Sequence, residues 1–380
     1  MSLVNSKTFS NKNILVVDKL QSGLKITSSD HYGEILSVIS QEPETIYRIT
    51  TSMGFFDCCG SQKVMTGTSV ENMIKIQAKH LKYTNNVFFS LCPLDGSVGT
   101  SIPDFLTQDK EKGYKLRLSS KIDTETAWFI GMIQSCFFYG TDSIIVEIQF
   151  GEEENMFQYD TKNRDVAERI KRNLLNLCSK LDVNIDTYEK SGKYSVSCTN
   201  EKMFKFLQRI QNRISFNEIR VHEFLFSSTV EIREAYIAGV IDGSSVLKRD
   251  NFNITTITYS EFTKDLQILL SGLGHQSRDC FVTERIPSFS NTYSVNYSLD
   301  LVFNNKSRDF GEVIKMVTRQ EVKKHYMKLA PKRTDTIKPL KFVFESVYVD
   351  KVEAHKGLHK NYKITTDKDC PYICDGYLFA

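Results

Sequence analysis

The chain has 380 residues, of which 41% are hydrophobic and 25% charged, and its formal net charge is +3. This length allows two or three domains of ordinary globular composition, and the small net charge excludes a uniformly basic polyanion binder. No run approaches the ~20 apolar residues that span a bilayer, so we expect no membrane contact. No secretory signal opens the sequence, and the nine cysteines are an odd number. We therefore expect an intracellular chain with free thiols.

In chain order, the hydrophobic pattern predicts a β-rich beginning, an α/β middle and a β-rich end. Residues 1–120 consist of short β-branched runs separated by turn residues. The middle predicts helix, strand, helix, strand and helix twice in succession, first over 127–135, 142–150, 165–181, 193–199 and 201–214, then over 235–243, 251–259, 260–274, 291–303 and 307–326. Additional hairpin strands stay open. Residues 331–340 contain two prolines and predict a linker.

The two series begin with similar helices. The segments AWFIGMIQS, from Ala127, and AYIAGVIDG, from Ala235, share a pattern of small, aromatic and apolar residues and start 108 positions apart. In each segment small residues recur at i, i+4 and i+8, so they lie on one helix face and allow two backbones to approach closely. We predict that the two helices pack on each other at a pseudo-twofold interface, which brings their C-terminal ends together. The alternative is two unrelated amphipathic core helices.

The segments YIAGVIDGS and FIGMIQSCF resemble the two motifs of single-chain LAGLIDADG homing endonucleases of the intein-derived type. Both ends of the chain, including KNILVVDKLQSGLKITSS and NYKITTDKDCPYICDGYLFA, are similar to the opening and closing strands of a Hint (intein) domain. The resemblance implies an α+β fold in which a duplicated LAGLIDADG core, with two αββαββα-like repeats, is nested in a split, β-rich Hint domain. The expected boundaries are 1–120 and 338–380 for the Hint part, and 121–220 and 221–337 for the two repeats of the core.

In this family each motif ends in an acid, and the two acids hold Mg²⁺, which activates water and stabilises the leaving oxygen. The resemblance places Cys136 and Ser244 at these positions, and neither residue supplies the anionic oxygen that Mg²⁺ selects. We therefore expect no bound metal, and a need for Mg²⁺ only if some nuclease activity survives. Two acids are candidates to replace the missing pair. One is Asp242, two residues before Ser244, although a two-residue step turns a helix by ~200° and should point its side chain elsewhere. The other is Asp142, six residues after Cys136.

The resemblance also implies lysines that neutralise phosphate charge beside the acids. Lys323 or Lys324 falls where the second repeat of the family carries a catalytic lysine, and Arg220 lies near the counterpart position before the second motif. A lysine pair at a helix end has a simpler explanation, because the helix dipole favours positive charge there.

Family members lay the strands of each repeat in the DNA major groove, where side chains on alternate positions read bases. Double-stranded DNA is therefore the expected partner. Candidate DNA contacts in the second half are Lys248, Arg249, Asn251, Asn253, Thr255 and Arg278. In the first half, Glu147 and Gln149 occupy the corresponding strand, whose acidic surroundings repel phosphate. The alternative is that these residues form the ordinary surface of an inherited fold.

Protein splicing needs a nucleophile at the first residue, a histidine that distorts the scissile amide, and a terminal His-Asn pair. The sequence begins Met1-Ser2, ends Phe379-Ala380, and reads CGSQ over 59–62, where the resemblance places the histidine. We expect no splicing.

Two other patterns concern metal and nucleotide binding. His355 and His359, together with Cys370 and Cys374, have spacings seen in zinc sites, but the cysteines fall in predicted strands that separate them. No phosphate-binding glycine motif occurs, so no nucleotide cofactor is expected.

Three functions fit these observations. The first is a catalytically degenerate endonuclease relative that binds DNA in the nucleus as a monomer with internal pseudo-twofold symmetry. The second is an active site-specific endonuclease that uses displaced acids. The third is a protein-interaction module built on the inherited fold.

Overall fold

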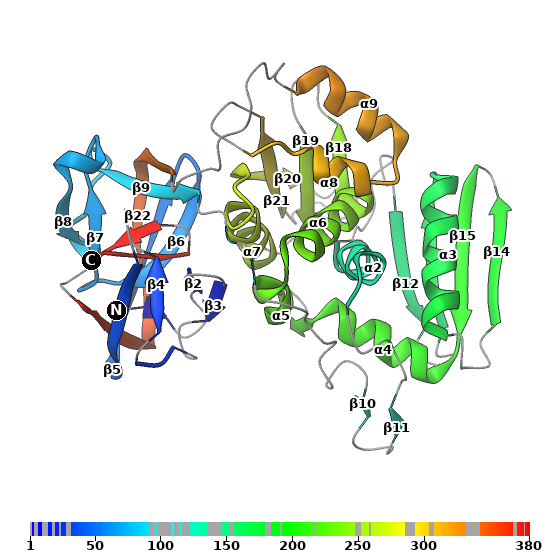
Figure 1. Ribbon diagram of the computed structural model, residues 1–380, viewed down its shortest axis with the longest axis horizontal. Coiled ribbons are helices and arrows are strands. Elements are labelled where there is room, and N and C mark those ends of the chain that lie inside the picture. Colours follow the sequence, from blue (N-terminus) through cyan, green and yellow to red (C-terminus); the bar gives the residue numbers. More distant parts are fainter. Residues whose placement is uncertain are drawn as a thin grey trace.

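The computed structural model shows a β-rich part on one side and two α/β units beside it (Figure 1). The residues that the structure describes are 2–3, 7–9, 14–16, 20–22, 24–27, 32–91, 94, 96, 108–109, 114–115, 122–135, 146–151, 156–178, 184–190, 192–215, 218–247, 252–257, 260–285, 293–303, 308–330, 343–367, 371–375 and 377–380.

Strands from both ends of the chain form the β-rich part, which is blue and red in Figure 1. Within the described residues they make one 12-stranded sheet, with the order β3-β2-β23-β24-β7-β9-β22-β5-β4 and with β1, β6 and β8 pairing off this path. The strands are β1 (Ser2–Leu3), β2 (Lys7–Phe9), β3 (Ile14–Val16), β4 (Lys25–Thr27), β5 (Tyr32–Thr51), β6 (Gly54–Cys59), β7 (Lys63–Thr66), β8 (Ile74–Gln77), β9 (Asn86–Leu91), β22 (Val343–Thr366), β23 (Tyr372–Cys374) and β24 (Tyr377–Phe379).

The long strand β22 joins the two ends of the sequence. It pairs antiparallel with β5, from Val349 opposite Thr51 to Thr366 opposite Ile35, and its first residues pair with β9. Alternating apolar side chains of these strands bury a core of their own, in which the rings of Phe56 and Tyr377 lie 4.3 Å apart.

The first α/β unit follows the β-rich part in the chain. Its strands form a four-stranded antiparallel sheet in the order β12-β13-β15-β14. The elements are α2 (Thr124–Ser135), β12 (Val146–Gly151), β13 (Met156–Thr161), α3 (Arg164–Cys178), β14 (Asn184–Lys190), β15 (Lys193–Thr199) and α4 (Glu201–Gln211). Two short strands, β10 (Gln108–Asp109) and β11 (Tyr114–Lys115), pair with each other before this unit.

The second α/β unit has the same order of elements. Its sheet runs β18-β19-β21-β20, so the strands take the same relative positions as in the first unit. The elements are α6 (Val230–Ser244), β18 (Ser245–Leu247), β19 (Phe252–Ile257), α7 (Ser260–Ser271), β20 (Gln276–Arg285), β21 (Tyr293–Val302), α8 (Gly311–Met316) and α9 (Gln320–Leu329). The connection between the units contains β16 (Arg213–Ser215), β17 (Glu218–Ile219) and α5 (Glu223–Ser227).

The additional hairpin strands that the hydrophobic pattern leaves open are present: each expected strand of the two units pairs with a second strand that is short or mainly polar. One feature differs from the sequence-based expectation. The helix predicted over 307–326 is two helices, α8 and α9, separated by Val317, Thr318 and Arg319. In the part of the chain that the structure describes, no helix is both long enough and apolar enough to span a membrane.

Helix α7 holds the β-rich part against the second unit through charged groups. Asp265 accepts hydrogen bonds from Lys7 of β2 and from the guanidinium of Arg220, and it also accepts one from the Val221 amide at 3.0 Å. Burial acts to raise the pKa of Asp265, but Lys7 and Arg220 hold it at about 2. Asp265 is therefore ionised and compensated inside the protein.

A second ion pair crosses the same boundary, between Lys264 Nζ and Asp375 Oδ2 at 3.0 Å. The side-chain amide of Gln267 donates to the Met53 carbonyl, so a third position of α7 also contacts the β-rich part.

Candidate functional site at the tips of two crossing helices

Helices α2 and α6 cross with their backbones in contact, in the centre of Figure 1. A Cβ atom added at Gly131 would overlap the carbonyl of Tyr236 and lie 3.0 Å from its carbon, and a Cβ added at Gly239 would lie 2.8 Å from the carbonyl carbon of Trp128. The contact is reciprocal, because each glycine touches the backbone three residues before the other glycine. The close approach predicted from the small residues is present in the structure.

Reciprocal hydrogen bonds lock the same crossing. The indole Nε1 of Trp128 on α2 donates to Asp242 Oδ2 on α6 at 2.8 Å. The hydroxyl of Tyr236 on α6 donates to Gln134 Oε1 on α2 at 2.6 Å. All four side chains are buried, and each residue of the second pair stands 108 positions from its counterpart in the first. Trp128 is therefore part of the core.

Asp242 is fully used as a structural acceptor. Besides the Trp128 indole, its carboxylate accepts the backbone N–H groups of Thr318 at 2.7 Å and Arg319 at 3.1 Å. Burial raises the pKa of Asp242, and the three donated hydrogen bonds oppose this effect. The carboxylate lies inside the helix junction, not at the tip, and it explains why α8 and α9 are separate helices.

Gln134 has the equivalent role in the first unit. Its side-chain nitrogen donates to the carbonyls of Gln211, at the end of α4, and Arg220, at 3.3 and 3.1 Å. Both residues thus connect a crossing helix to backbone at or beyond the end of α4 or α8. Gln134 does so by donating from an uncharged amide, whereas Asp242 does so by accepting.

At the tips, the last described residues carry hydroxyl groups that bond within their own helix. Ser244 Oγ donates to the Val240 carbonyl at 3.0 Å, and Ser135 Oγ donates to the Met132 carbonyl at 3.0 Å. Arg319 is next to the tip of α6, where its guanidinium donates to the Ser245 carbonyl at 2.9 Å. Cys136 and Asp142 lie outside the described residues.

No cluster of three or more histidine, cysteine, aspartate or glutamate side chains able to hold a metal ion occurs within the described ranges. Divalent magnesium prefers several oxygen ligands, at least some of them carboxylates. The described side chains at the tips do not match this preference, since a serine hydroxyl bonded to its own helix is neutral.

The two candidate lysines lie on α9. Lys323 Nζ donates to the Lys315 carbonyl on α8 at 3.4 Å, and Lys324 is exposed to solvent. Arg220, the counterpart proposed before the second motif, is bound to Asp265 through two hydrogen bonds. The structure therefore does not bring these three cations together.

The candidate DNA contacts belong mainly to one sheet. Asn253 and Thr255 are in β19, and Arg278 is an exposed residue of β20, an outer strand of the same sheet. Lys248, Arg249 and Asn251 lie outside the described residues. His355 and His359 are both in β22, where the pairing with β5 shifts register between Ala354 and Leu358, and Cys370 is outside the described residues.

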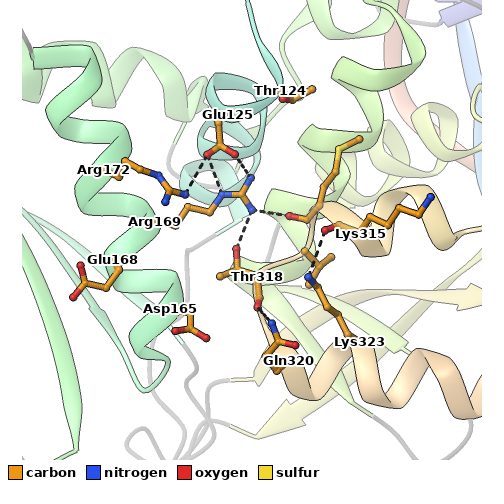
Figure 2. Close-up of a pocket in the computed structure, with 12 residues that line it drawn as sticks. Thr124, Glu125, Asp165, Glu168, Arg169, Arg172, Lys315, Thr318, Gln320 and Lys323 are labelled. Carbon is orange, nitrogen blue, oxygen red and sulfur yellow. Dashed lines mark hydrogen bonds and ion pairs between the residues drawn. The ribbon is translucent and has the colours of Figure 1, made fainter.

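A pocket of about 530 Å³ opens where α2, α3, α8 and α9 meet, on the seam between the two units (Figure 2). Its floor is Arg169, whose guanidinium stacks on Trp128 at 4.0 Å and bonds Glu125 at 2.7 Å. The wall residues are Thr124, Asp165, Glu168, Arg172, Lys315, Met316, Val317, Thr318, Gln320 and Lys323.

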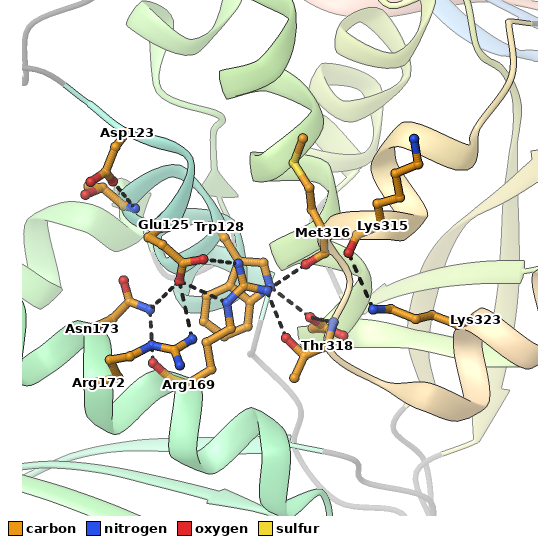
Figure 3. Close-up of polar contacts among 12 residues, drawn as sticks. Asp123, Glu125, Trp128, Arg169, Arg172, Asn173, Lys315, Met316, Thr318 and Lys323 are labelled. Carbon is orange, nitrogen blue, oxygen red and sulfur yellow. Dashed lines mark hydrogen bonds and ion pairs between the residues drawn. The ribbon is translucent and has the colours of Figure 1, made fainter.

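Arg169 connects the pocket to the helix crossing. Its Nη1 atom donates to the Met316 carbonyl at 2.6 Å and to Thr318 Oγ1 at 2.9 Å, next to the backbone that Asp242 holds (Figure 3). Burial acts to raise the pKa of Glu125, but the hydrogen bonds from Arg169 keep it below its ordinary value.

Sequence reasoning did not identify Arg169 or Gln134. Gln134 had a usable signal, since it stands 108 positions before Asp242 within the repeat. Arg169 had none, because its partners in the second unit, the Met316 carbonyl and the Thr318 hydroxyl, are 147 and 149 positions away in the sequence.

No protein-family profile matches the sequence, and no curated protein does. Among solved structures, the chain is similar to I-DmoI in complex with its target DNA, with 11% identity over 51% of this chain and 93% of that chain and a TM-score of 0.34. It is similar to I-DmoI in complex with DNA and Ca, with 12% identity over 51% and 88% of the chains and a TM-score of 0.33. A third similarity is to mesophilic variants of the homing endonuclease I-DmoI, with 11% identity over 51% and 95% of the chains and a TM-score of 0.32.

Proposed function

We propose that this chain is a catalytically degenerate relative of the LAGLIDADG homing endonucleases that binds double-stranded DNA without cutting it. In this proposal the two α/β units, over 121–220 and 221–337, are the repeats of a duplicated core in one monomer. The β-rich part, over 1–120 and 338–380, is a split Hint-like domain around that core. The DNA would be nuclear.

The observation that carries the proposal is the reciprocal contact between α2 and α6. Gly131 and Gly239 each touch the backbone of the opposite helix, and the bonds Trp128–Asp242 and Tyr236–Gln134 repeat across the same crossing. Unrelated core helices have no physical reason to share both features at one constant spacing. The equal strand order of the two sheets supports the same conclusion.

Loss of cutting is proposed from the residues at the helix tips. Ser244 is neutral and bonds Val240, and the nearby Asp242 has three donors inside the junction. An endonuclease that uses a metal needs paired anionic oxygens beside the scissile phosphates. Asp242 could supply them only by releasing the Trp128 indole and the backbone amides that separate α8 from α9.

The DNA surface is proposed on the sheet β18-β19-β21-β20, with Arg278 as its described cation. Contacts with phosphate release counterions, so affinity should fall steeply as salt is raised. A gel shift with random-sequence duplex DNA over a salt series tests this, with Arg278→Glu as the variant. If binding is absent at low salt, or does not depend on salt, the DNA-binding proposal fails.

Cutting is tested by adding Mg²⁺ or Mn²⁺ and looking for nicked or linear product. We expect none from the natural sequence. The double variant Cys136→Asp with Ser244→Asp should restore metal-dependent nicking of a bound target, because it returns both acids. Cys136→Asn with Ser244→Asn is the matched control of the same size without charge. Metal-dependent cleavage by the unmodified chain would overturn the degenerate assignment.

We propose that the chain does not splice, because Gln62 occupies the position where the resemblance places a histidine. Gln62 is buried, and its amide donates to Tyr372 Oη and to the Ala380 carbonyl at 3.3 and 3.4 Å. An amide cannot exchange a proton near neutral pH as imidazole does. A tagged chain should therefore keep its full mass on a denaturing gel, and a shorter spliced product would contradict the proposal.

A further inference from the structure

Helices α3 and α7 occupy equivalent places in the two units, but their surroundings differ. Each follows the second strand of its unit and packs on its own sheet. Every residue from Phe262 to Ser271 of α7 is buried, because the β-rich part covers its outer face. Helix α3 lies at the opposite end of the molecule and keeps an exposed outer face (Figure 1).

The two helices also use their sixth residue in the same way. Asp265 of α7 binds Arg220, which follows the last helix of the first unit. Arg169 of α3 binds Met316, the last residue of α8 in the second unit, and Thr318, which follows α8. At α7 the β-rich part adds Lys7 to this junction. At α3 the same location is the open pocket of about 530 Å³.

The surface around the pocket is rich in cations. On α9, the Met327 side chain is 76% exposed and is surrounded by lysines. Lys323 and Lys324 precede it by four and three residues, which places them on the same side of the helix, and Lys328 follows it directly. Glu321, the acid of this helix, is bound to Arg319 at 2.7 Å. We call Lys323, Lys324, Met327 and Lys328 the α9 surface.

The pocket floor does not offer a free donor for a compact anion. The Arg169 guanidinium is already shared among Glu125, Met316 and Thr318. Attraction must therefore come from the exposed cations of the rim, which act at a distance and through several weak contacts. This arrangement suits an extended ligand better than a single phosphate or carboxylate.

Charges on the other wall distinguish between two kinds of extended anion. Asp165 and Glu168 are exposed and line the α3 side of the pocket, opposite Lys323 (Figure 2). A phosphate backbone, which is negative along its whole length, would be repelled there. A short peptide can place acidic side chains along α9 only and an apolar side chain on Met327, a flexible residue common at peptide-binding surfaces.

We propose that the α9 surface and the adjoining pocket form a docking site for an acidic protein segment that carries an apolar residue. The pocket lies beside α3 of the first unit, whereas the equivalent face of α7 in the second unit is covered by the β-rich part, and the α9 surface of the second unit borders the pocket. The inference rests on the two-unit organisation and is independent of whether the chain binds DNA.

The test uses a fluorescein-labelled peptide of glutamates with one central leucine, and measures anisotropy with the full-length chain at low salt. Lys323→Glu with Lys324→Glu should weaken binding about tenfold, a change of about 1.4 kcal/mol. Lys79→Glu with Lys82→Glu changes two exposed lysines of the β-rich part and should weaken it less than twofold. Equal effects of the two pairs, or no binding by the natural sequence, would overturn the proposal.

Two further measurements keep the alternatives apart. Met327→Ser should remove the advantage of the leucine peptide over an otherwise equal serine peptide. Duplex DNA binding should be unchanged by the Lys323 and Lys324 reversals, whereas Arg278→Glu weakens it. If the Lys323 and Lys324 variant also lost DNA binding, the α9 surface would be a phosphate-binding surface. If the natural chain formed a concentration-dependent dimer that this variant lost, the α9 surface would be a contact between copies of the chain. Either result would refute the peptide proposal.

Discussion

At the scale of single residues, Gly239 permits the backbones of α2 and α6 to touch. An alanine there has a better intrinsic helix propensity, by about 1 kcal/mol. We nevertheless expect Gly239→Ala to lower the free energy of unfolding by about 2 kcal/mol or more, because its Cβ would overlap the Trp128 carbonyl and force α2 and α6 apart. Urea denaturation measures the change.

Gly311→Ala is the control for the Gly239 experiment. The three atoms nearest a Cβ at Gly311 all belong to the Asp309 side chain, at 3.2 to 3.5 Å, and none is a backbone atom. We expect a change of less than about 1 kcal/mol there. If Gly239→Ala were as stable as the natural protein, the described helix crossing would be wrong.

His222 is a second residue whose environment has a measurable consequence. Burial lowers its pKa to about 4, although hydrogen bonds to backbone carbonyls, including that of Ile210 at 2.8 Å, act to raise it. The unfolded chain has an ordinary histidine pKa near 6.5, so it takes up a proton at a higher pH than the folded chain does. The contribution of His222 to stability is therefore complete above about pH 6.5 and falls by about 3 kcal/mol as the pH decreases to about 4.

The measurement is the free energy of unfolding at several pH values between about 7 and 5, for the natural chain and for His222→Gln. The natural chain should lose about 2 kcal/mol from this group over that interval, and the variant should lack this part of the slope. Identical pH slopes would show that His222 is not held neutral in the folded protein.

At the scale of elements, the hydrophobic pattern predicts those structures that depend on local sequence. The sequence shows a separate residue pattern for each of these elements. The patterns are the small residues of α2 and α6, the amphipathic periodicity of α3 and α4, and the β-branched runs of β12 and β19. The sequence also predicts that the side chains of Ser244 and Asp242 point in different directions, because two residues along a helix correspond to a turn of ~200°.

The division between α8 and α9 could not be predicted in this way. The sequence from Ser307 to Tyr326 has continuous helical character, but Asp242 binds the amides of Thr318 and Arg319 from a helix 76 and 77 positions away. A distant acceptor thus decides where the helix ends. The pocket and Arg169 were missed for the same reason, because they depend on how two units meet.

Helix α7 gives a prediction at this scale, since its Asp265 holds two cations from different parts of the chain. The pKa of Asp265 is about 2, below that of the unfolded chain, so its contribution is present above about pH 4 and is lost as the pH falls toward 2. We expect the natural chain to lose about 2 kcal/mol from this group in that window. Asp265→Asn should show a smaller acid slope in chemical denaturation.

At neutral pH the same variant should be less stable by about 3 kcal/mol or more, because Lys7 and Arg220 keep buried charges without their carboxylate. Asp57→Asn is the matched control. Asp57 pairs with Arg48 at 2.8 Å, but the Arg48 side chain is 28% exposed, so water compensates more of the loss. Equal losses in the two variants would contradict the buried network at α7.

At the scale of the whole molecule, the arrangement is asymmetric. The two units meet through a reciprocal crossing, yet among the described residues the buried charged helix face that contacts the β-rich part belongs to the second unit. The sheet of the first unit lies at the far end of the molecule from the β-rich part (Figure 1).

The buried contacts of α7 predict that the β-rich part and the α/β units unfold together. Trp128 is the chain's one tryptophan and lies in the α2–α6 core, so its fluorescence reports the units, whereas far-UV circular dichroism includes the 12-stranded sheet. The two signals should give one coincident urea transition for the natural chain. The double variant Lys264→Ala with Asp375→Ala removes both members of one ion pair, so neither charge of that pair is left buried without its partner. The boundary loses this contact, and the two transitions should therefore separate. Separate transitions in the natural chain would show instead that the β-rich part folds independently of α7.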